Sequence, residues 1–253
     1  MKNSQLRRFC VGLVLAGTAV VAVGSPSSAS KLPQKQGHTA TLLLDGKVLI
    51  AGGGVDEGEG LSGSALLLDP TSGAWTKTGA MQASRSGGHT ATLLKSGEVL
   101  VAGGFDDQNA VSAAELYDPS NGTWRSAGRV LPARYRHSAT LLPDGRVLLT
   151  GGQRRGHGPF LDDSWLYDPA KNSWKKTGSM QRGRSEHSAT LLSDGKVLAA
   201  GGRIVAHGNA ADDALVYSTD SQSWDFVPNL MTLKRAEHGA VRLADGDVLL
   251  TGG

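Results

Sequence analysis

Short apolar runs on either side of a turn recur along this chain with a period near fifty residues. The first copy, HTATLLLDGKVLIAGG, begins at His38, and related copies begin at His89, His137, His187 and His238. Both runs of each copy are apolar at consecutive positions, which predicts strands that are buried on both faces. A long fixed period predicts stacked units, because one such unit cannot bury its own apolar faces.

Each copy predicts a β-hairpin. The two runs are separated by Asp45-Gly46, Ser96-Gly97, Asp144-Gly145, Asp194-Gly195 and Asp245-Gly246. Two-residue Asp-Gly loops supply the positive φ angles that a type I′ turn requires. The sequence therefore predicts two-residue hairpin turns, with Ser96-Gly97 as the weaker form of the signal.

Two further strands follow each hairpin. The second run of each complete unit ends in a glycine pair, namely Gly52-Gly53, Gly103-Gly104, Gly151-Gly152 and Gly201-Gly202. After a polar segment come two markers seven residues apart, namely Leu68 with Trp75, Tyr117 with Trp124, Tyr167 with Trp174, and Tyr217 with Trp224. The residues between the markers are typical of turns. Each unit therefore predicts four antiparallel strands, with the periodic tryptophans in the core.

Repeated four-stranded units without helices favour a β-propeller. The order of glycine pair, tyrosine, tryptophan and an M-x-x-x-R segment resembles the kelch repeat over residues 37–253, and HSATLLPDGRVLLTGG is similar to the central domain of galactose oxidase. The resemblance implies an all-β fold, a kelch-type β-propeller of four-stranded antiparallel blades. Its units begin near residues 38, 89, 137, 187 and 238, which gives four complete units and one first hairpin. Because kelch propellers usually have about six or seven blades, we expect an incomplete propeller, either a fragment or an open arc.

The first residues predict a targeting segment of the secreted bacterial type. Lys2, Arg7 and Arg8 precede the apolar run FCVGLVLAGTAVVAV, and small residues surround Ala29. We interpret residues 1–29 as a signal peptide and 30–36 as a short linker, with an uncleaved signal anchor as the alternative. This predicts export to the periplasm or the extracellular space, and no membrane span in the mature chain.

Charge and cysteine content narrow the classes of function. Removing residues 1–29 leaves 26 − 3 = 23 Lys and Arg against 23 Asp and Glu, so the mature net charge is zero and does not favour nucleic-acid binding. The single cysteine, Cys10, lies in the signal segment. Residues 30–253 therefore offer no disulfide, cysteine nucleophile or thiolate metal site.

By its resemblance to kelch propellers, the chain would bind ligands on the face that carries the loops between strands two and three and between blades. Candidate ligand-binding residues on this face are Arg85, Arg134, Arg184, Arg235, His157 and His207. The alternative for the repeated arginines is that they brace the next blade through backbone carbonyls or Asp partners. The five repeated histidines lie on successive blades, so we expect them to bond between blades, and we predict no metal site.

Other polar and aromatic groups allow two interpretations. Asp162-Asp163 and Asp212-Asp213 suggest calcium or acid–base chemistry, but their position favours turns at the start of strand three. Trp165 either fills a gap between blades or stacks on a ligand.

Two hypotheses of function follow. The first is a non-catalytic exported module that binds a protein or a glycan through the loop face, without a cofactor. The second is the propeller of a carbohydrate-acting enzyme, similar to the oxidases or to the kelch-type sialic acid epimerase, with catalytic residues outside this chain or in the channel mouth. The oxidases need a cysteine crosslinked to tyrosine, which residues 30–253 lack. Glu186 beside Arg184 and Glu237 beside Arg235 are the acid–base candidates, although their recurrence favours a structural role.

Overall fold

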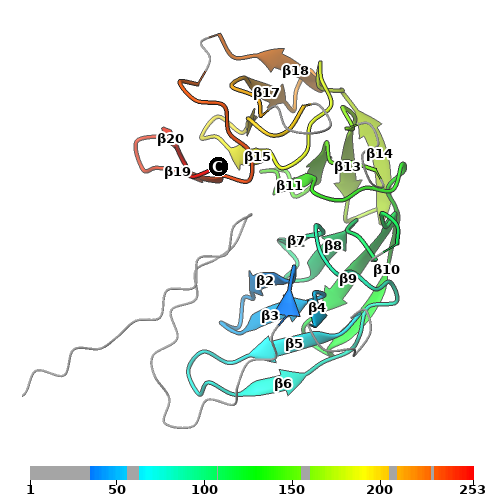
Figure 1. Cartoon of the computed structure of the whole chain (residues 1–253). Coiled ribbons are helices and arrows are strands. Elements are labelled where there is room, and N and C mark those ends of the chain that lie inside the picture. The colour runs from blue at the N-terminus through cyan, green and yellow to red at the C-terminus, as the bar shows by residue number, and fades with distance from the viewer. Residues whose placement is uncertain (1–34, 56–62, 107, 155–159, 205–209, 229–230) are drawn as a thin grey trace, which may run out of the picture.

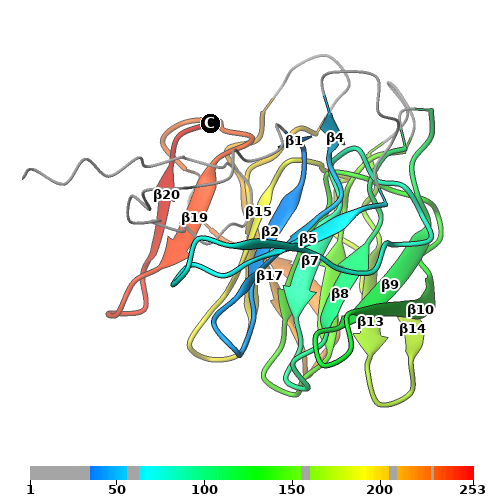
Figure 2. The ribbon, with the colours of Figure 1, turned by 90° about the horizontal axis from the view of Figure 1, so that it is seen from below.

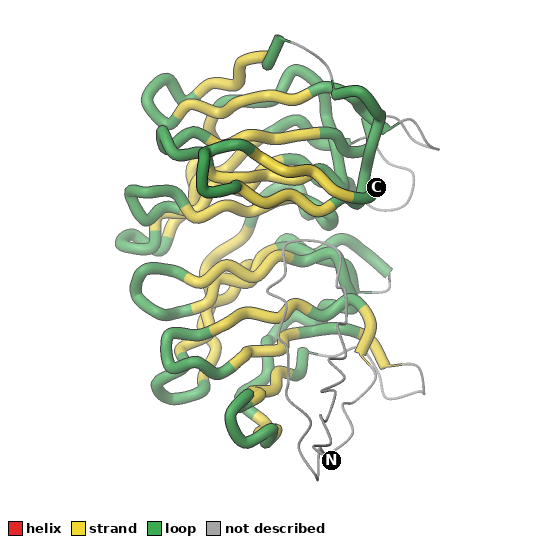
Figure 3. Tube along the Cα trace, turned by 90° about the vertical axis from the view of Figure 1, so that its left-hand side faces the viewer, coloured by secondary structure: helices red, strands yellow, loops and turns green. Residues whose placement is uncertain are grey.

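The computed structural model describes residues 35–55, 63–106, 108–154, 160–204, 210–228 and 231–253. These residues form strands and loops, and none of them is helical (Figure 3). Four four-stranded antiparallel sheets follow one another along the chain, and a two-stranded hairpin comes last. The prediction of an all-β fold with four-stranded antiparallel units is confirmed.

Each sheet, or blade, takes its strands in sequence order. Blade one is β2 (Thr39–Leu42), β3 (Val48–Ala51), β5 (Ala65–Leu68) and β6 (Trp75–Lys77). Blade two is β7 (Thr90–Leu93), β8 (Val99–Ala102), β9 (Ala113–Asp118) and β10 (Thr123–Arg129). Blade three is β11 (Ser138–Leu141), β12 (Val147–Thr150), β13 (Ser164–Asp168) and β14 (Ser173–Thr177). Blade four is β15 (Ser188–Leu191), β16 (Val197–Ala200), β17 (Ala214–Ser218) and β18 (Ser223–Phe226), and the last hairpin is β19 (Gly239–Arg242) with β20 (Val248–Thr251).

The blades lie side by side in an arc. The first strands β2, β7, β11, β15 and β19 line its inner side, and the fourth strands β6, β10, β14 and β18 lie on its outer side (Figure 1). Seen from a perpendicular direction, the hairpin turns project at one end of the arc and the longer loops gather at the other (Figure 2). We call these the turn end and the loop end.

The apolar core lies between neighbouring blades. Second strands such as β8 and β12 are buried along their whole length, as their continuous apolar runs predict. The tyrosine of strand three is fully buried in blades two, three and four, and its ring contacts the tryptophan of strand four with centroids 5.0–5.3 Å apart. The indole N–H of Trp124 donates to the Gly79 carbonyl and that of Trp174 donates to the Ala127 carbonyl, so these residues also join blades.

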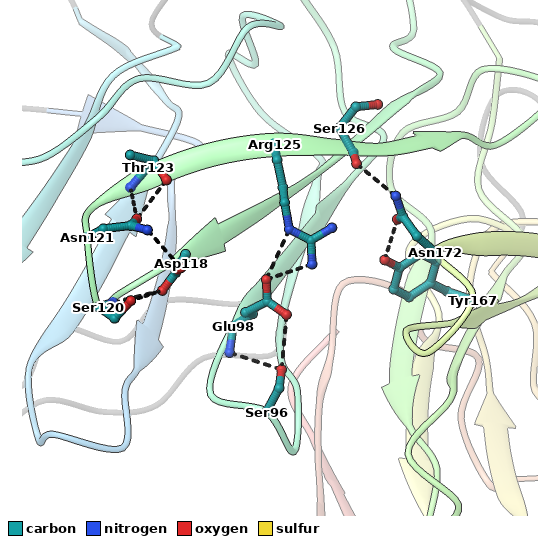
Figure 4. Close-up of polar contacts among 10 residues, drawn as sticks. All are labelled: Ser96, Glu98, Asp118, Ser120, Asn121, Thr123, Arg125, Ser126, Tyr167 and Asn172. Atoms are coloured by element: carbon teal, nitrogen blue, oxygen red, sulfur yellow. Dashed lines mark hydrogen bonds and ion pairs between the residues drawn. The ribbon is translucent and has the colours of Figure 1, made fainter.

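The hydroxyl of the buried tyrosine in blade three has a different hydrogen-bond partner from those in blades two and four. The hydroxyls of Tyr117 and Tyr217 pair with threonines at the end of the preceding blade, namely Thr78, which directly follows β6, and Thr177, the last residue of β14. The equivalent residue before Tyr167 is Ala127, which has no hydroxyl. The Tyr167 hydroxyl instead donates to Asn172 of its own turn, and the Asn172 amide donates to the Ser126 carbonyl of blade two (Figure 4). A buried hydroxyl thus keeps a partner despite the lost threonine.

The prediction of two-residue type I′ turns is wrong. In the first hairpin the Leu43 amide donates to the Lys47 carbonyl and the Gly46 amide donates to the Leu43 carbonyl, which leaves a three-residue loop. Gly46 has a φ of 84°, whereas Asp45 has no positive φ. This is a type I turn followed by a left-handed glycine. The Asp45 carboxylate accepts the Lys47 amide at 3.0 Å and favours this loop over the type I′ form.

A short pair of strands was not predicted. Lys35–Gln36, which the sequence places in a linker, forms β1 and pairs with β4 (Gly54–Val55) beyond the first glycine pair. The described chain therefore begins against the loop end of blade one.

One arginine per unit joins each blade to the next through its backbone and its side chain. The carbonyls of Arg85, Arg134, Arg184 and Arg235 accept the amides of Gly53, Gly104, Gly152 and Gly202 of the preceding unit at 2.8–2.9 Å. A Cβ on the first glycine of a pair would lie 2.5–2.8 Å from the same carbonyl. Both glycines also have positive φ. The glycine pairs are therefore required by this close approach.

The guanidinium group of the same arginine binds the following blade. Arg134 donates to the Gly151 carbonyl at 3.0 Å and to both carboxylate oxygens of Asp163 at 2.8 and 3.0 Å. Arg184 makes the same contacts with the Gly201 carbonyl and Asp213. Burial opposes the charge on Asp163, but Arg134 lowers its pKa below the ordinary value. We call each such arginine, with its glycine and carboxylate partners, an arginine clamp.

The clamp before blade two uses a different acid. Arg85 contacts Glu115 at 2.8 Å, and Glu115 also accepts the backbone amides of Gln82 and Ala83. Arg85, Arg134 and Arg184 have no exposed surface. These residues are therefore paired charges inside the protein, where loss of one partner would leave the other uncompensated.

Replacing Arg184 by Met should lower the free energy of unfolding by about 3–5 kcal/mol, because Asp213 would remain buried without its partner. Urea unfolding of the purified protein measures the change. The control is Arg182→Met, two residues away and exposed, for which we expect a change within about 0.5 kcal/mol. Equal effects of the two substitutions would contradict the clamp.

The buried histidines should make the fold sensitive to acid. Burial, with a smaller contribution from the charge on Arg85, lowers the pKa of His89 to about 4, and burial and Arg184 lower the pKa of His187 to about 3. The unfolded chain, with histidine pKa values of about 6.5, binds more protons below that pH. The stabilisation is thus complete above about pH 6.5 and is lost as the pH falls towards about 4.

We expect the free energy of unfolding to fall by about 1.4 kcal/mol per pH unit for each such histidine within this window. Urea unfolding at a series of pH values measures the slope. His89→Gln should reduce the slope by the contribution of one histidine, about 1.4 kcal/mol per pH unit. An unchanged slope in that variant would show that His89 titrates alike in the folded and unfolded chain.

Candidate functional site

The loop end is built as a continuous rim. In blades two, three and four, the residue after the glycine pair forms a bridge with the segment that enters the same blade, so that the loop within a blade meets the loop between blades. The bridged pairs are Gly87 with Phe105, Tyr135 with Gln153, and Ser185 with Arg203. This confirms, for the described loops, that the loops within blades and between blades share one end.

All five residues that directly precede a repeated histidine have left-handed backbone. Gly37 and Gly88 have φ angles of 72° and 66°, and the equivalent Arg136, Glu186 and Glu237 have φ angles of 56°, 56° and 57°. The amide of each of the last three donates to the carbonyl of its counterpart in the preceding unit at 2.8–3.0 Å. These bonds join the blades around the channel mouth.

Charged residues at three of these positions are costly for the backbone. A left-handed φ is easy for glycine but unfavourable by about 1 kcal/mol or more for other L-residues. Gly88 shows that glycine is accepted at this position. The side chains of Arg136, Glu186 and Glu237 are therefore present at a cost, which is typical of a functional surface.

The charged rim residues form one chain of ion pairs. The Glu186 carboxylate is 5% exposed and contacts Arg136 through one oxygen and Arg203 through the other. Arg203 also approaches Glu237 at 3.4 Å. Arg136, Arg203 and Glu237 are partly exposed, at 48%, 39% and 55% of their side chains. The rim thus presents alternating positive and negative groups beside the channel.

An aromatic pair continues this chain towards blade two. The rings of Phe105 and Tyr135 lie 5.3 Å apart at an angle of 44°, and the Arg136 guanidinium lies 5.6 Å from the Tyr135 ring centre. The Gln153 amide donates to the Tyr135 hydroxyl and accepts from the Ser185 hydroxyl. One side of the rim is therefore aromatic and the other is ionic.

A pocket of about 390 Å³ opens along the inner side of the arc, where the first strands meet the rim. Its walls carry the methyl and hydroxyl groups of small first-strand residues such as Ala139, Ser138 and Thr90, and its mouth carries Arg136 and Glu186. The volume lies in the range typical of small-ligand sites.

The predicted arginines are not at the surface of this site. Arg85, Arg134 and Arg184 are the buried clamp residues, and contact with a ligand would require the clamps to open. Arg235 is half-buried, and its guanidinium donates to the Gly252 carbonyl at 3.0 Å. His157 and His207 lie outside the described residues.

The remaining candidates take structural positions. Asp163 and Asp213 hold the clamp arginines. Trp165 packs at the interface of blades two and three and donates to Asp163 at 2.9 Å. In the part of the chain that the structure describes, no three acidic, histidine or cysteine side chains are grouped to hold a metal ion, and no helix could span a membrane.

Of the residues that form the rim, the sequence identified Glu186 and Glu237 as acid–base candidates and missed the others. Phe105, Tyr135, Arg136 and Arg203 do not recur in every unit, so the repeat pattern alone does not identify them. The signal that could have identified them is variation between units, not recurrence. Positions directly after the glycine pairs and directly before the repeated histidines change from unit to unit within a fixed frame. Variation at a fixed place on a repeating scaffold is typical of binding surfaces.

The KLHDC2/KLHL20/DRC7 kelch-repeats domain family matches residues 37–253. Kelch-like protein 36 of Mus musculus is 29% identical over 135 residues, which cover 52% of this chain and 21% of that protein. Kelch-like protein 36 of Bos taurus is 29% identical over 133 residues, covering 51% and 21%. The matched region thus spans about a fifth of the length of these curated relatives.

The solved structure of YjhT superposes with a TM-score of 0.68 at 17% identity, over 86% of this chain and 80% of that chain. At this identity the likeness concerns the fold alone. Together with the family match over residues 37–253, it agrees with the four-stranded blades, the glycine pairs and the buried tyrosine–tryptophan contacts. This chain belongs to the kelch-repeat family and has the kelch propeller fold.

Proposed function

We propose that this kelch propeller is a non-catalytic binding module that holds a protein or glycan ligand on its loop end. The contact surface is the rim of Phe105, Tyr135, Arg136, Arg203 and Glu237, together with the pocket below it. Kelch propellers support binding in general, and the frame of this one keeps its loops at a common end.

One observation carries the proposal. Arg136, Glu186 and Glu237 keep charged side chains at left-handed positions where Gly88 shows that glycine fits. These three charged side chains make no contact within the arginine clamps, which are formed by other pairs such as Arg134 with Asp163. A surface that retains an unfavourable backbone to present charge beside a pocket is suited to ligand recognition.

A second candidate is a carbohydrate-acting enzyme, and Glu186 is the residue that favours it. Its carboxylate lines the pocket and is almost fully buried. Both of its oxygens are already in ion pairs with arginines, so proton transfer to a ligand would first require one pair to separate. The copper-radical chemistry of the galactose oxidase type does not fit residues 30–253, because they contain no cysteine. Binding without catalysis therefore needs fewer rearrangements.

We also propose that the protein acts after export, in the periplasm or outside the cell. The basic residues followed by the apolar run from Phe9 to Val23 and by small residues support this.

Export makes a direct prediction about the N-terminus. The secreted protein should begin near Ser30, because cleavage is expected after Ala29 in the small-residue segment. The mass of the protein recovered outside the cytoplasm, with its N-terminal peptide, measures this. A protein that retains Met1 would contradict a cleaved signal.

Binding on the rim predicts which substitutions reduce affinity. A peptide display library and a glycan array, both probed with residues 30–253, supply ligands, and titration then gives their dissociation constants. Arg203→Ala should weaken binding about tenfold or more, as expected when a charge-assisted hydrogen bond to a ligand is lost.

The matched control is Lys196→Ala, which removes a partly exposed cation from the turn end. It should leave the affinity within about twofold. Equal loss of affinity in the two variants, or no ligand that is sensitive to Arg203, would contradict binding on the rim. Release of a chemically altered sugar would favour the enzyme instead.

A further inference from the structure

The exposed charge of the rim lies mainly at its two ends. Glu186 is enclosed between Arg136 and Arg203, which contact its two carboxylate oxygens. Arg203 lies between two carboxylates, since it also contacts Glu237. Arg136 and Glu237, at opposite ends of this chain of ion pairs, are its most exposed members. The rim therefore presents a cation at one end and an anion at the other.

Both end groups keep hydrogen-bonding capacity. Arg136 contacts Glu186 through Nη1, and its Nε and Nη2 atoms have no hydrogen-bond partner among the described residues. One oxygen of Glu237 lies 3.4 Å from Nη2 of Arg203, and the other has no partner in the described part of the chain. A strong charge-assisted bond is about 2.8 Å long, and exposed ion pairs add little to stability. A ligand can therefore bind these groups without separating a strong pair.

An aromatic surface adjoins the cationic end. The rings of Phe105 and Tyr135 contact each other, and the Arg136 guanidinium lies over the Tyr135 ring. Both aromatic residues are partly exposed. Phenylalanine, tyrosine and arginine are enriched at protein–protein interfaces, and tyrosine and arginine often dominate the binding energy. From blade two to the last hairpin, the rim thus offers an aromatic, a cationic and an anionic contact in that order.

The backbone fixes the spacing of the two end charges. The Glu186 amide donates to the Arg136 carbonyl and the Glu237 amide donates to the Glu186 carbonyl, both at 3.0 Å. Segments joined in this way lie about 4.8 Å apart, so the backbone at Arg136 and the backbone at Glu237 are separated by about 10 Å. An extended peptide advances about 3.3 Å per residue. Ligand side chains two to four residues apart therefore match the two ends.

Opposite charges at the two ends distinguish between classes of ligand. Two arginines and two glutamates give the chain of ion pairs no net charge. A ligand with charges of one sign is attracted at one end and repelled at the other, and a neutral sugar uses neither charge. A peptide with an acidic and a basic side chain gains from both ends. The rim therefore favours a protein segment over a glycan.

We propose that the rim binds an extended peptide segment of a protein partner, in which an acidic side chain lies between an aromatic and a basic one. The aromatic side chain packs on Phe105 and Tyr135. The acidic side chain accepts hydrogen bonds from Arg136, and the basic one donates to Glu237. This inference rests on the proposed binding function and deepens it by naming the class of partner and the order of its contacts.

Synthetic peptides of equal composition test the order of the contacts. Each contains one tryptophan, one glutamate and one lysine, separated by spacers of one to three serines, and is made in both chain directions with blocked termini. Fluorescence anisotropy of the labelled peptides with residues 30–253 measures the dissociation constants. We expect a peptide with glutamate in the middle to bind about tenfold or more tightly than every isomer with lysine in the middle. Absence of binding by all peptides with central glutamate, or equal affinity of the isomers, would overturn the proposal.

An exchange of charge at one residue locates the basic contact. Glu237→Lys should weaken the tightest peptide about tenfold or more, and should prefer the peptide whose lysine is replaced by glutamate. The matched control is Asp225→Lys, which makes the same change at an exposed position of β18 on the outer side of the arc and should keep the affinity within about twofold. An equal effect of the two substitutions, or an unchanged preference for lysine in folded Glu237→Lys, would overturn the proposal.

Glu237→Gln provides a second test without a new charge. It keeps the shape of the side chain, so it should fold even if Glu237→Lys does not, and thermal melting against the parent checks this. Peptides with lysine and with glutamine at the basic position should bind this variant within about twofold of each other. A preference for lysine as large as that of the parent would overturn the proposal.

The outcome separates this inference from the proposed function. If a ligand that depends on Arg203 is a glycan, or is a peptide insensitive to Glu237→Lys, the rim binds but the proposed order of contacts is wrong. The proposed function then stands. If no ligand depends on Arg203, both are wrong. Exchange of preference in Glu237→Lys, together with weaker binding of the same peptide to Arg203→Ala, supports both.

Discussion

The buried arginine clamp is the interaction on which the rest of the structure depends. Each clamp residue gives its carbonyl to the glycine pair of one unit and its guanidinium to the glycine carbonyl and carboxylate of the next. The glycine pairs follow from this geometry, since a Cβ would collide with the arginine carbonyl. A paired charge without water is costly to separate, so the clamp fixes the position of neighbouring blades more strictly than apolar packing alone would.

The clamp also explains how the loop end can vary while the fold stays constant. The rim residues Tyr135, Arg136 and Glu186 follow the clamp arginines Arg134 and Arg184 by one or two positions. Their backbone is held by bonds between units, so their side chains can change without loss of blade packing. Within the same frame, the Ser138 hydroxyl donates to the backbone carbonyl of His187, and the two ring nitrogens of His187 have no hydrogen-bond partner. In the proposed function, the side chains that differ from unit to unit are the ones that contact the ligand.

The sequence predicted the repeating parts of this protein well and the site poorly. Strand number and antiparallel order followed from the apolar runs and from markers such as Tyr117 with Trp124, because those features depend on local period and burial. The turn type was wrong since Asp45 also bonds the chain two residues on. Arg134 takes the structural position given as the alternative for the repeated arginines, bonded to a backbone carbonyl and to an Asp partner, although the sequence did not identify Asp163 as that partner. The rim of Phe105 and Arg203 arises only when adjacent units meet.

The most direct test of this account is native-state hydrogen exchange at the glycine amides that join blades. Gly104 and Gly152 donate to the carbonyls of Arg134 and Arg184 at 2.8 Å. If the clamps hold the blades, these amides should exchange as slowly as those of the buried strands β8 and β12, through global unfolding alone. Exchange at the rates of the turn-end loops would show that the blades separate locally, and would contradict the central role of the clamp.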